Sequence, residues 1–358
     1  MKKAERQFLF DLLNTPSPSG FEARGQKCWV DYVRQHTDSV ETDSYGTAWA
    51  TREASHADGA PTVMLEAHAD EIGFMVNHID NDGYLFVSRI GGTDRAMARG
   101  KRVQILGDDG PVPGVVGNTA IHLRETRNEK VPEWHKIFVD IGASSRDDVH
   151  ERGIRVGHPM VYTDATEELT PGRLTGRALD NRVGGYIIAQ VVARLAEGKR
   201  TPATVYAVNA VQEEIGGYGA KMIAYRLHPT VAIVLDVTHA TDSPGVEKVK
   251  HGDVKLGAGP SLTHGSCNHP MVVQRLMDVA EQAEIPLQHE AASLYTGTDT
   301  DDVFIARTGV PSALVSLPMR YMHSTVETVE LEDIERCIQL LLEFARSVTP
   351  QDDFSVEL

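Results

Sequence analysis

Two kinds of hydrophobic pattern alternate along residues 173–358 of the chain. Short continuous apolar runs indicate buried strands, and apolar residues at every third or fourth position indicate one-sided helices. The predicted strands are residues 203–211, 231–235 and 311–317, and the predicted helices are residues 183–195, 218–227, 271–283, 303–308 and 331–348. This alternation predicts a mostly parallel sheet with helices on both faces, an α/β/α sandwich.

The first half of the chain has a different pattern of hydrophobic and turn-forming residues. Residues 8–13 predict an amphipathic helix that ends at Pro16, and residues 62–67 (TVMLEA) predict a buried strand. From Ile72 to Asp164, β-like runs such as GYLFVSRI, RVQIL and GVVGNTAIHL alternate with turn-forming GG, DDGP and PVPG. We therefore predict a catalytic α/β domain made of residues 1–71 and 165–358, with a small barrel-like β domain, residues 72–164, inserted into it.

Charge and composition exclude several classes of protein. The chain has 358 residues, with 51 acidic against 35 basic side chains and a formal net charge of -16. Such a charge disfavours binding to nucleic acid or acidic membranes. The three cysteines, Cys28, Cys267 and Cys337, have no paired spacing, which argues against a disulfide framework or a thiolate zinc site. No apolar run is long enough for a membrane span or a signal peptide, so a cytoplasmic protein is expected.

Residue types that bind metals follow four of the predicted strands, and another precedes a helix. Sites in open α/β sheets form outside the carboxyl ends of the strands, so these side chains are expected to converge. In chain order they are His68 and Asp70, Asp180 in the glycine-rich loop GRLTGRALDNRVGG, Glu213 and Glu214, Asp236, and His323.

Each of these residues alone has an ordinary explanation, such as a loop histidine or a helix N-cap. Together they would crowd negative charge into one crevice, which is costly unless cations occupy it. Asp180, Glu214 and Asp236 carry three negative charges against four on two divalent ions, which leaves room for one bridging hydroxide. Two imidazoles with three carboxylates suit zinc, cobalt or manganese better than calcium.

The spacing of two residue pairs, His68 with Asp70 and Glu213 with Glu214, indicates what individual side chains can do. Residues two apart on an extended backbone point the same way, so Asp70 can accept a hydrogen bond from the second ring nitrogen of His68. Neighbouring side chains diverge, so either Glu213 or Glu214 can bind metal while the other faces the bridging water. The spacing leaves open which of the two does which.

Six stretches of the chain resemble a known family and come in that family's order. They are HADEIGFMV, GRALDNRVGG, NAVQEEIGG, VLDVTHATDSPG, TGTDTD and RYMHSTVE. They are similar to the dinuclear-metal aminopeptidases of metallopeptidase family forty-two, which includes tetrahedral glutamyl-, leucyl- and lysyl-type enzymes and some proteins described as endoglucanases. The resemblance covers essentially the whole chain.

The resemblance implies an aminopeptidase that hydrolyses N-terminal residues from peptides, with two metal ions, zinc first, and cobalt or manganese as alternatives. It implies a homo-oligomer, commonly a tetrahedral dodecamer built from dimers through the inserted domain, and a cis peptide bond between Asp180 and Asn181. The implied roles are His68 and Asp236 on one metal, Glu214 and His323 on the other, Asp180 between them, Glu213 as general base and Asp70 as the partner of His68. The stretch TDTDD departs from relatives that have alanine after the second aspartate, a position outside the ligands that bears on substrate selection.

Three other functions are compatible with parts of the pattern. A related dinuclear hydrolase of acylated amino acids or terminal carboxylates would share the metals but carry a different sequence around His68. A glycosidase needs two carboxylates free to flank the sugar, whereas the most suitable carboxylates of this chain are predicted to bind metal. A non-enzymatic scaffold is disfavoured because no ligand position has been lost.

Other candidate residues are assigned structural roles. Five histidines lack a matching carboxylate at ligand spacing: His78, His122, His239, His264 and His269. Gly91-Gly92 and Gly184-Gly185 fit turns and close helix packing rather than phosphate binding, because no Walker-type lysine follows. The preferred N-terminal residue is not predicted, because the specificity pocket draws on scattered loops.

Overall fold

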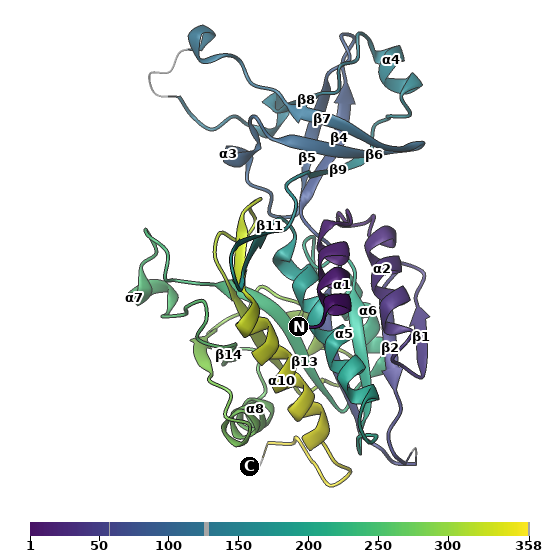
Figure 1. The fold of residues 1–358 in the computed structure, drawn as a ribbon, viewed down its shortest axis with the longest axis vertical. Helices are drawn as coiled ribbons and strands as arrows, with labels where there is room; N and C mark the ends of the chain where they lie inside the picture. Colours follow the sequence, from purple (N-terminus) through teal and green to yellow (C-terminus); the bar gives the residue numbers. More distant parts are fainter. Residues whose placement is uncertain (57, 125–128, 357–358) are drawn as a thin grey trace.

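A computed structural model of the protein describes residues 1–56, 58–124 and 129–356. Its centre is an eight-stranded sheet (Figure 1). Across the sheet the strands are β1 (Ser39–Thr42), β2 (Ala48–Arg52), β12 (Thr204–Ala210), β3 (Thr62–His68), β13 (Val231–His239), β16 (Ser312–Met319), β14 (Ser261–His264) and β15 (Gln288–Ala291). The four central strands, β12, β3, β13 and β16, run parallel, and antiparallel pairing is confined to β1–β2, β2–β12 and β16–β14.

Helices cover both faces of this sheet. Alternate residues of a strand point to opposite faces, and in β13 Val231, Ile233 and Leu235 pack into one core while Ala232 and Val234 pack into another. The first core is covered by α1 (Lys3–Asn14), α2 (Ala23–Val33), α5 (Leu179–Ala196), α8 (Pro270–Gln282) and α10 (Leu331–Ser347), and the second by α6 (Tyr218–Leu227) and α9 (Thr300–Val303). The predicted α/β/α sandwich is confirmed.

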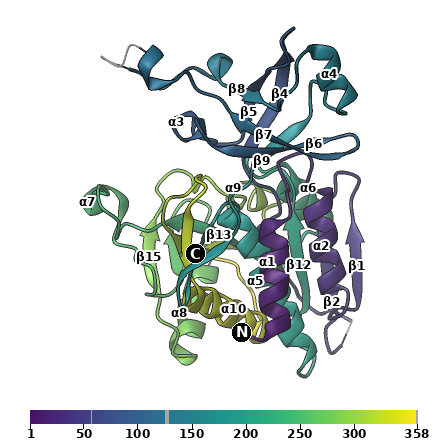
Figure 2. The same cartoon turned by 45° about the horizontal axis from the view of Figure 1, so that its top comes forward.

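A closed six-stranded barrel is inserted between β3 and the rest of the sandwich, and lies beyond one end of it (Figures 1 and 2). In order around the barrel its strands are β4 (Gly73–Ile79), β5 (Leu85–Ile90), β8 (Phe138–Asp140), β7 (Gly110–Val116), β6 (Arg102–Gly107) and β9 (Pro159–Tyr162). Phe74, Leu85, Val103 and Ile105 contribute to a hydrophobic core that is separate from the two cores of the sandwich. The barrel also carries the short helices α3 (Arg95–Ala98) and α4 (Arg146–Glu151) and two 3-10 turns, η1 (Ile121–Leu123) and η2 (Trp134–Lys136).

A third, three-stranded antiparallel sheet was not predicted. It consists of β10 (Glu167–Thr170), β11 (Arg173–Gly176) and β17 (Glu327–Glu330), with β11 in the middle. It joins the chain that leaves the barrel to the segment just before α10. The remaining helix, α7 (Lys248–His251), is a short helix in the connection between β13 and β14. Among the described residues, no helix is both long and apolar enough to cross a membrane.

Two local predictions are wrong. The helix predicted at residues 303–308 begins and ends earlier, at Thr300–Val303, because the following residues close single turns and Arg307 adopts a left-handed backbone with φ 51°. The β-like run GVVGNTAIHL ends as a strand at Val116, and Ile121–Leu123 forms a 3-10 turn. Ile121 and Leu123 are 60% and 79% exposed, so their apolar side chains do not mark a buried strand.

A buried arginine connects the start of α5 to the end of α1. Arg182 is 1% exposed, and its guanidinium donates hydrogen bonds to the carbonyl oxygens of Leu12 and Thr15 at the end of α1. These carbonyls would otherwise lack partners, because the last turn of a helix leaves its carbonyl groups free. The loop that carries Asp180 into the molecule is thereby tied to a second helix.

Candidate metal centre

The carboxyl ends of the central strands bring most of the predicted site residues together. His68 ends β3 and lies beside Ala210, which ends β12, so the Glu213-Glu214 dipeptide that follows β12 starts next to it. Asp236 lies in β13, the parallel neighbour of β3 on its other side. Asp180 arrives from the first turn of α5, and His323 from the segment between β16 and β17. These residues line a cavity of about 720 Å³, a size typical of ligand-binding pockets.

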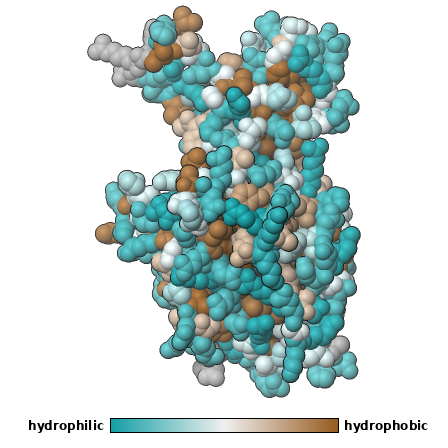
Figure 3. All heavy atoms as spheres, viewed as in Figure 1, coloured by the Kyte–Doolittle hydropathy of each residue, from teal (hydrophilic) through white to brown (hydrophobic). Residues whose placement is uncertain are grey.

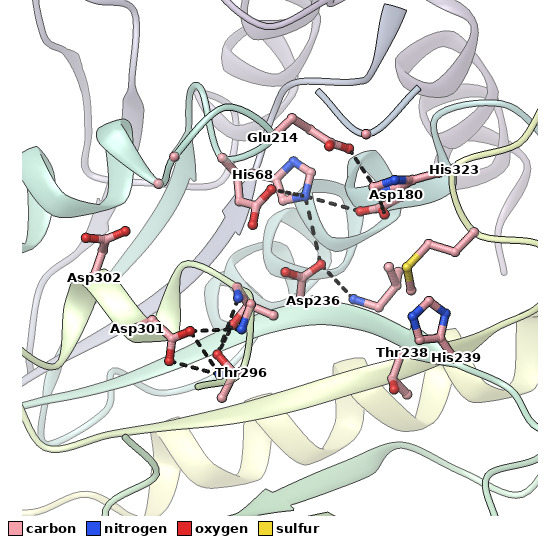
Figure 4. A pocket seen from close by; sticks show the side chains of 18 residues that line it. His68, Asp180, Glu214, Asp236, Thr238, His239, Thr296, Asp301, Asp302 and His323 are labelled. Carbon is pink, nitrogen blue, oxygen red and sulfur yellow. Dashed lines mark hydrogen bonds and ion pairs between the residues drawn. The ribbon is translucent and has the colours of Figure 1, made fainter. Parts of the chain in front are cut away.

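Asp180 lies between the two histidines (Figure 4). One of its oxygens, Oδ1, is 3.2 Å from His68 Nε2, and the other, Oδ2, is 3.4 Å from His323 Nε2. Asp236 Oδ1 is 3.8 Å from His68 Nε2, and Glu214 Oε1 is 3.6 Å from His323 Nε2. The donor atoms therefore form two clusters, each within 4.8 Å: His68, Asp180 and Asp236, and Asp180, Glu214 and His323. The clusters share Asp180.

Burial makes this concentration of negative charge unfavourable. Burial and then neighbouring charges, Asp180 or Asp236 among them, raise the pKa of Glu213, Glu214 and Asp236. Burial also opposes ionisation of Asp180, but hydrogen bonds from His323 and His68 outweigh it and lower the pKa of Asp180. Carboxyl groups in such a setting hold protons unless cations replace them. The donor set fits divalent metal ions, since both imidazole and carboxylate ligands are present.

Comparison with known proteins identifies the family. The family model described as M42 glutamyl aminopeptidase matches residues 46–340. The lysyl aminopeptidase of Pyrococcus furiosus is 36% identical over 349 residues, which cover 97% of this chain and 98% of that protein. The solved structure of the aminopeptidase APDkam598 from Desulfurococcus kamchatkensis superposes with a TM-score of 0.91 at 34% identity, covering 97% of this chain and 96% of that one. The TET1 peptidase of Pyrococcus horikoshii, at 27% identity, covers 96% and 100% with a TM-score of 0.85.

The chain belongs to the M42 aminopeptidase family. The resemblance to metallopeptidase family forty-two is confirmed, and the chain is a hydrolase of the peptidase class. M42 peptidases are metal-dependent, and within the described part of the chain the two clusters around Asp180 are the groups that could hold metal ions. The scaffold alternative is not supported, because the family is one of aminopeptidases.

In this M42 chain, Asp70 ties three parts of the site together. It is fully buried and lies 3.4 Å from His68 Nδ1 through its Oδ1. Its two oxygens also accept hydrogen bonds from the backbone N–H groups of Glu213 and Glu214, at 3.0 and 3.2 Å, and from the Ser19 hydroxyl at 2.6 Å. One carboxylate thus lies against the imidazole and holds the backbone of the dipeptide.

Three buried carboxylates near the centre were missed from the sequence. The clearest case is Glu327, which is 1% exposed at the start of β17. It accepts hydrogen bonds from the backbone N–H of His323 at 3.0 Å and of Asp180 at 3.2 Å. Glu66 and Asp299 are also buried, and burial raises the pKa of both. Glu66 is two residues before His68 on one strand, a spacing that could have revealed it.

The barrel of this M42 protein supplies one wall of the site through the turn after β5. Gly92 lines the cavity, and a Cβ atom there would overlap the His323 ring. A Cβ atom at Gly91, whose φ is +63°, would lie 2.9 Å from Glu214 Oε2. Gly91 and Gly92 do form the predicted turn, but they also leave room for two candidate ligands, which the sequence analysis did not anticipate. The close helix packing predicted at Gly184 is present, because a Cβ atom there would lie 2.9 Å from the Ala67 side chain on β3.

Other sequence predictions have mixed outcomes. The peptide bond between Asp180 and Asn181 is cis, as predicted. His239 lines the cavity but belongs to neither cluster. His264 hydrogen-bonds to His289 at 2.9 Å, away from the centre. The roles of the individual ligands stay predictions.

Replacing Glu327 with Gln removes one of the two acceptor oxygens that hold the His323 and Asp180 backbones. Partners of metal ligands typically contribute 10- to 100-fold to metal affinity, so zinc should bind the variant about 10- to 100-fold more weakly in a calorimetric titration. Glu330→Gln, on the same strand but paired with Arg173 away from the site, is the matched control and should bind zinc normally. Unchanged affinity in Glu327→Gln would show that these hydrogen bonds do not hold the ligands in place.

Proposed function

We propose that this M42 chain is an aminopeptidase with a dinuclear metal centre that removes N-terminal residues from peptides. The observation that carries the proposal is the sharing of Asp180 by the two clusters, with one carboxylate oxygen toward each histidine. Two divalent ions, zinc first and cobalt or manganese as alternatives, suit this mixed nitrogen and oxygen donor set. One ion would be held by His68 and Asp236, the other by Glu214 and His323, and Asp180 would contact both.

Individual residues would have separate roles in peptide hydrolysis. The bound ions would lower the pKa of the attacking water and polarise the scissile carbonyl. Glu213, whose carboxyl lines the cavity and belongs to neither cluster, takes the proton of that water and passes it to the leaving amine. Burial, together with neighbouring carboxylates such as Asp236, raises the pKa of Glu213. Cations bound beside it would offset this effect and keep the carboxylate ionised, as a proton acceptor must be. Asp70, which binds the Glu213 backbone, keeps that carboxyl in position.

We also propose that the inserted domain, residues 72–164, mediates self-association into dimers and a tetrahedral dodecamer. The TET1 peptidase of Pyrococcus horikoshii can assemble into a tetrahedron or a large octahedral shell. In this chain the inserted domain exposes Val115 on β7 and, in the connection from β7 to β8, Ile121, Leu123 and Val131, each at least 45% accessible. Figure 3 shows apolar residues on this part of the surface, at the top of the view. Exposed apolar groups of this kind favour protein–protein contacts.

The names of the relatives leave the substrate preference open. The family description reads glutamyl aminopeptidase, and the Pyrococcus furiosus relative is a lysyl aminopeptidase. One acts on an acidic N-terminal residue and the other on a basic one, so the preference of this chain must follow from its own cavity.

Removal of the metals should abolish peptidase activity. Dialysis against a chelator, followed by an assay with aminoacyl-anilides, should leave no hydrolysis, and added zinc or cobalt should restore it. Magnesium serves as the control, because it prefers all-oxygen ligands and should restore little. Full activity of the metal-free protein would contradict the proposed function.

The adjacent glutamates should separate catalysis from metal binding. Glu213→Gln keeps the shape but removes the proton acceptor, so kcat should fall by about 10²–10⁴-fold while two metals per subunit stay bound. Glu214→Gln removes a charged ligand and should weaken the binding of one metal. Metal stoichiometry and kcat measured on both variants test the assignment. Loss of a metal from Glu213→Gln but not from Glu214→Gln would reverse the two roles.

Removal of residues 72–164, with the flanks rejoined, should yield smaller assemblies in sedimentation. A gentler variant, Ile121→Asp with Leu123→Asp, places charge on the exposed barrel turn and should have the same effect with the fold intact. Val249→Asp, at a fully exposed apolar position of the sandwich, is the matched control and should keep the parent assembly. A full-length assembly in all three proteins would show that the barrel does not mediate association.

A further inference from the structure

The charges that line the cavity are all of one sign, apart from its histidines. Six of the lining residues are carboxylates, and none of the described lining residues is lysine or arginine. Four of the six, Asp180, Glu213, Glu214 and Asp236, are engaged by the proposed metal centre. The other two, Asp301 and Asp302, lie in the first turn of α9, to one side of the candidate ligands (Figure 4).

Asp301 has a structural task. Its carboxylate accepts hydrogen bonds from the backbone N–H groups of Thr296 and Gly297, at 2.9 and 2.8 Å, and from the Cys267 thiol at 3.2 Å. Two of these donors hold it against the 296–297 loop, which forms one wall of the cavity. Asp301 shapes this wall.

The Asp302 carboxylate accepts fewer hydrogen bonds than that of Asp301. Its Oδ1 accepts a hydrogen bond from Lys221 Nζ at 3.1 Å, and no other side-chain hydrogen bond to Asp302 is formed within the described part of the chain. Lys221 is 57% exposed, and an ion pair with such exposure contributes little to stability. The remaining oxygen, Oδ2, packs against Gly217, where a Cβ atom would overlap it. Gly217 lies three residues after Glu214, which places the Asp302 carboxylate on the wall beside the catalytic dipeptide.

The cavity wall next to Asp302 leaves room for a long side chain. Gly297 lines the cavity and has no side chain, and a Cβ atom there would meet nothing within 4 Å. An aliphatic stem can lie along such a surface while its charged end reaches a carboxylate.

We propose that Asp302 is a specificity-determining residue that selects peptides with a positively charged N-terminal side chain, lysine or arginine. This inference rests on the proposed aminopeptidase function. The ammonium or guanidinium group would share the Asp302 carboxylate with Lys221 or displace Lys221 into solvent. An N-terminal glutamate would instead meet like charge in a cavity without a lysine or arginine, which disfavours its binding.

The test compares kcat/KM for lysyl-, arginyl-, leucyl- and glutamyl-anilides on the full-length, metal-loaded protein. The lysyl and arginyl substrates should exceed the leucyl substrate by about tenfold or more and the glutamyl substrate by more still. Asp302→Asn, which keeps the shape but removes the charge, should lower the lysyl-to-leucyl ratio by about tenfold. Asp302→Glu, which keeps the charge, should retain most of the ratio.

Lys221→Met is the matched control, because it removes the other half of the ion pair. If Asp302 recognises substrate, this variant should keep or raise the lysyl-to-leucyl ratio. If Asp302 only anchors Lys221, both Asp302→Asn and Lys221→Met should lower activity on all substrates by a common factor, and the inference is overturned. Preference of the parent protein for leucyl or glutamyl substrates overturns it as well. Absence of hydrolysis of every anilide would instead overturn the proposed function itself.

Discussion

Repulsion between buried carboxylates is the constraint on which the rest of this structure depends. Parallel strands end at a common edge, and here three neighbouring strands, β12, β3 and β13, bring Glu213, Glu214, His68 and Asp236 to that edge. Asp180 adds a further charge from the first turn of α5. Two histidines cannot neutralise this set, and burial raises the pKa of three of its carboxyl groups. A fold that assembles such a site is built to contain cations.

Much of the surrounding structure serves to hold the carboxylates against this repulsion. Asp70 and Glu327 accept backbone hydrogen bonds from four site residues between them, so the directions of the site side chains are set by the main chain. Two non-glycine residues at the site adopt left-handed backbone, Gln212 with φ 63° directly before Glu213, and His323 with φ 60°. Such conformations cost about 1–3 kcal/mol each, and they persist where surrounding contacts enforce them. Both turn the chain sharply enough to aim a side chain back into the cavity.

The sequence predicts which residues gather at this edge of the sheet for one physical reason, and it misses their buried neighbours for another. His68, Glu213, Glu214 and Asp236 lie at or just beyond the ends of apolar runs, and strand ends can be recognised from hydrophobicity alone. Glu327 was missed because its importance lies in hydrogen bonds to two backbone groups, and Asp299 because its importance lies in burial, and no spacing reveals either. The error at residues 303–308 has the same origin, since Arg307 turns out of the helix in a backbone conformation that apolar periodicity does not encode. The exposed Ile121 and Leu123 misled the strand prediction because apolar character does not distinguish burial from surface exposure.

The barrel is a separate hydrophobic unit, yet it is part of the candidate active site. Its core shares no residues with those of the sandwich, so its packing does not require the sheet. The turn after β5, however, reaches over the carboxyl edge of the sheet, and at Gly91 and Gly92 it lies so close to Glu214 and His323 that side chains are excluded. A displacement of the barrel would therefore change the space around two candidate ligands. Surface contacts that orient the barrel and the geometry of the candidate metal centre are mechanically linked through these two glycines, whereas Asp302 lies on α9 of the sandwich, outside this link.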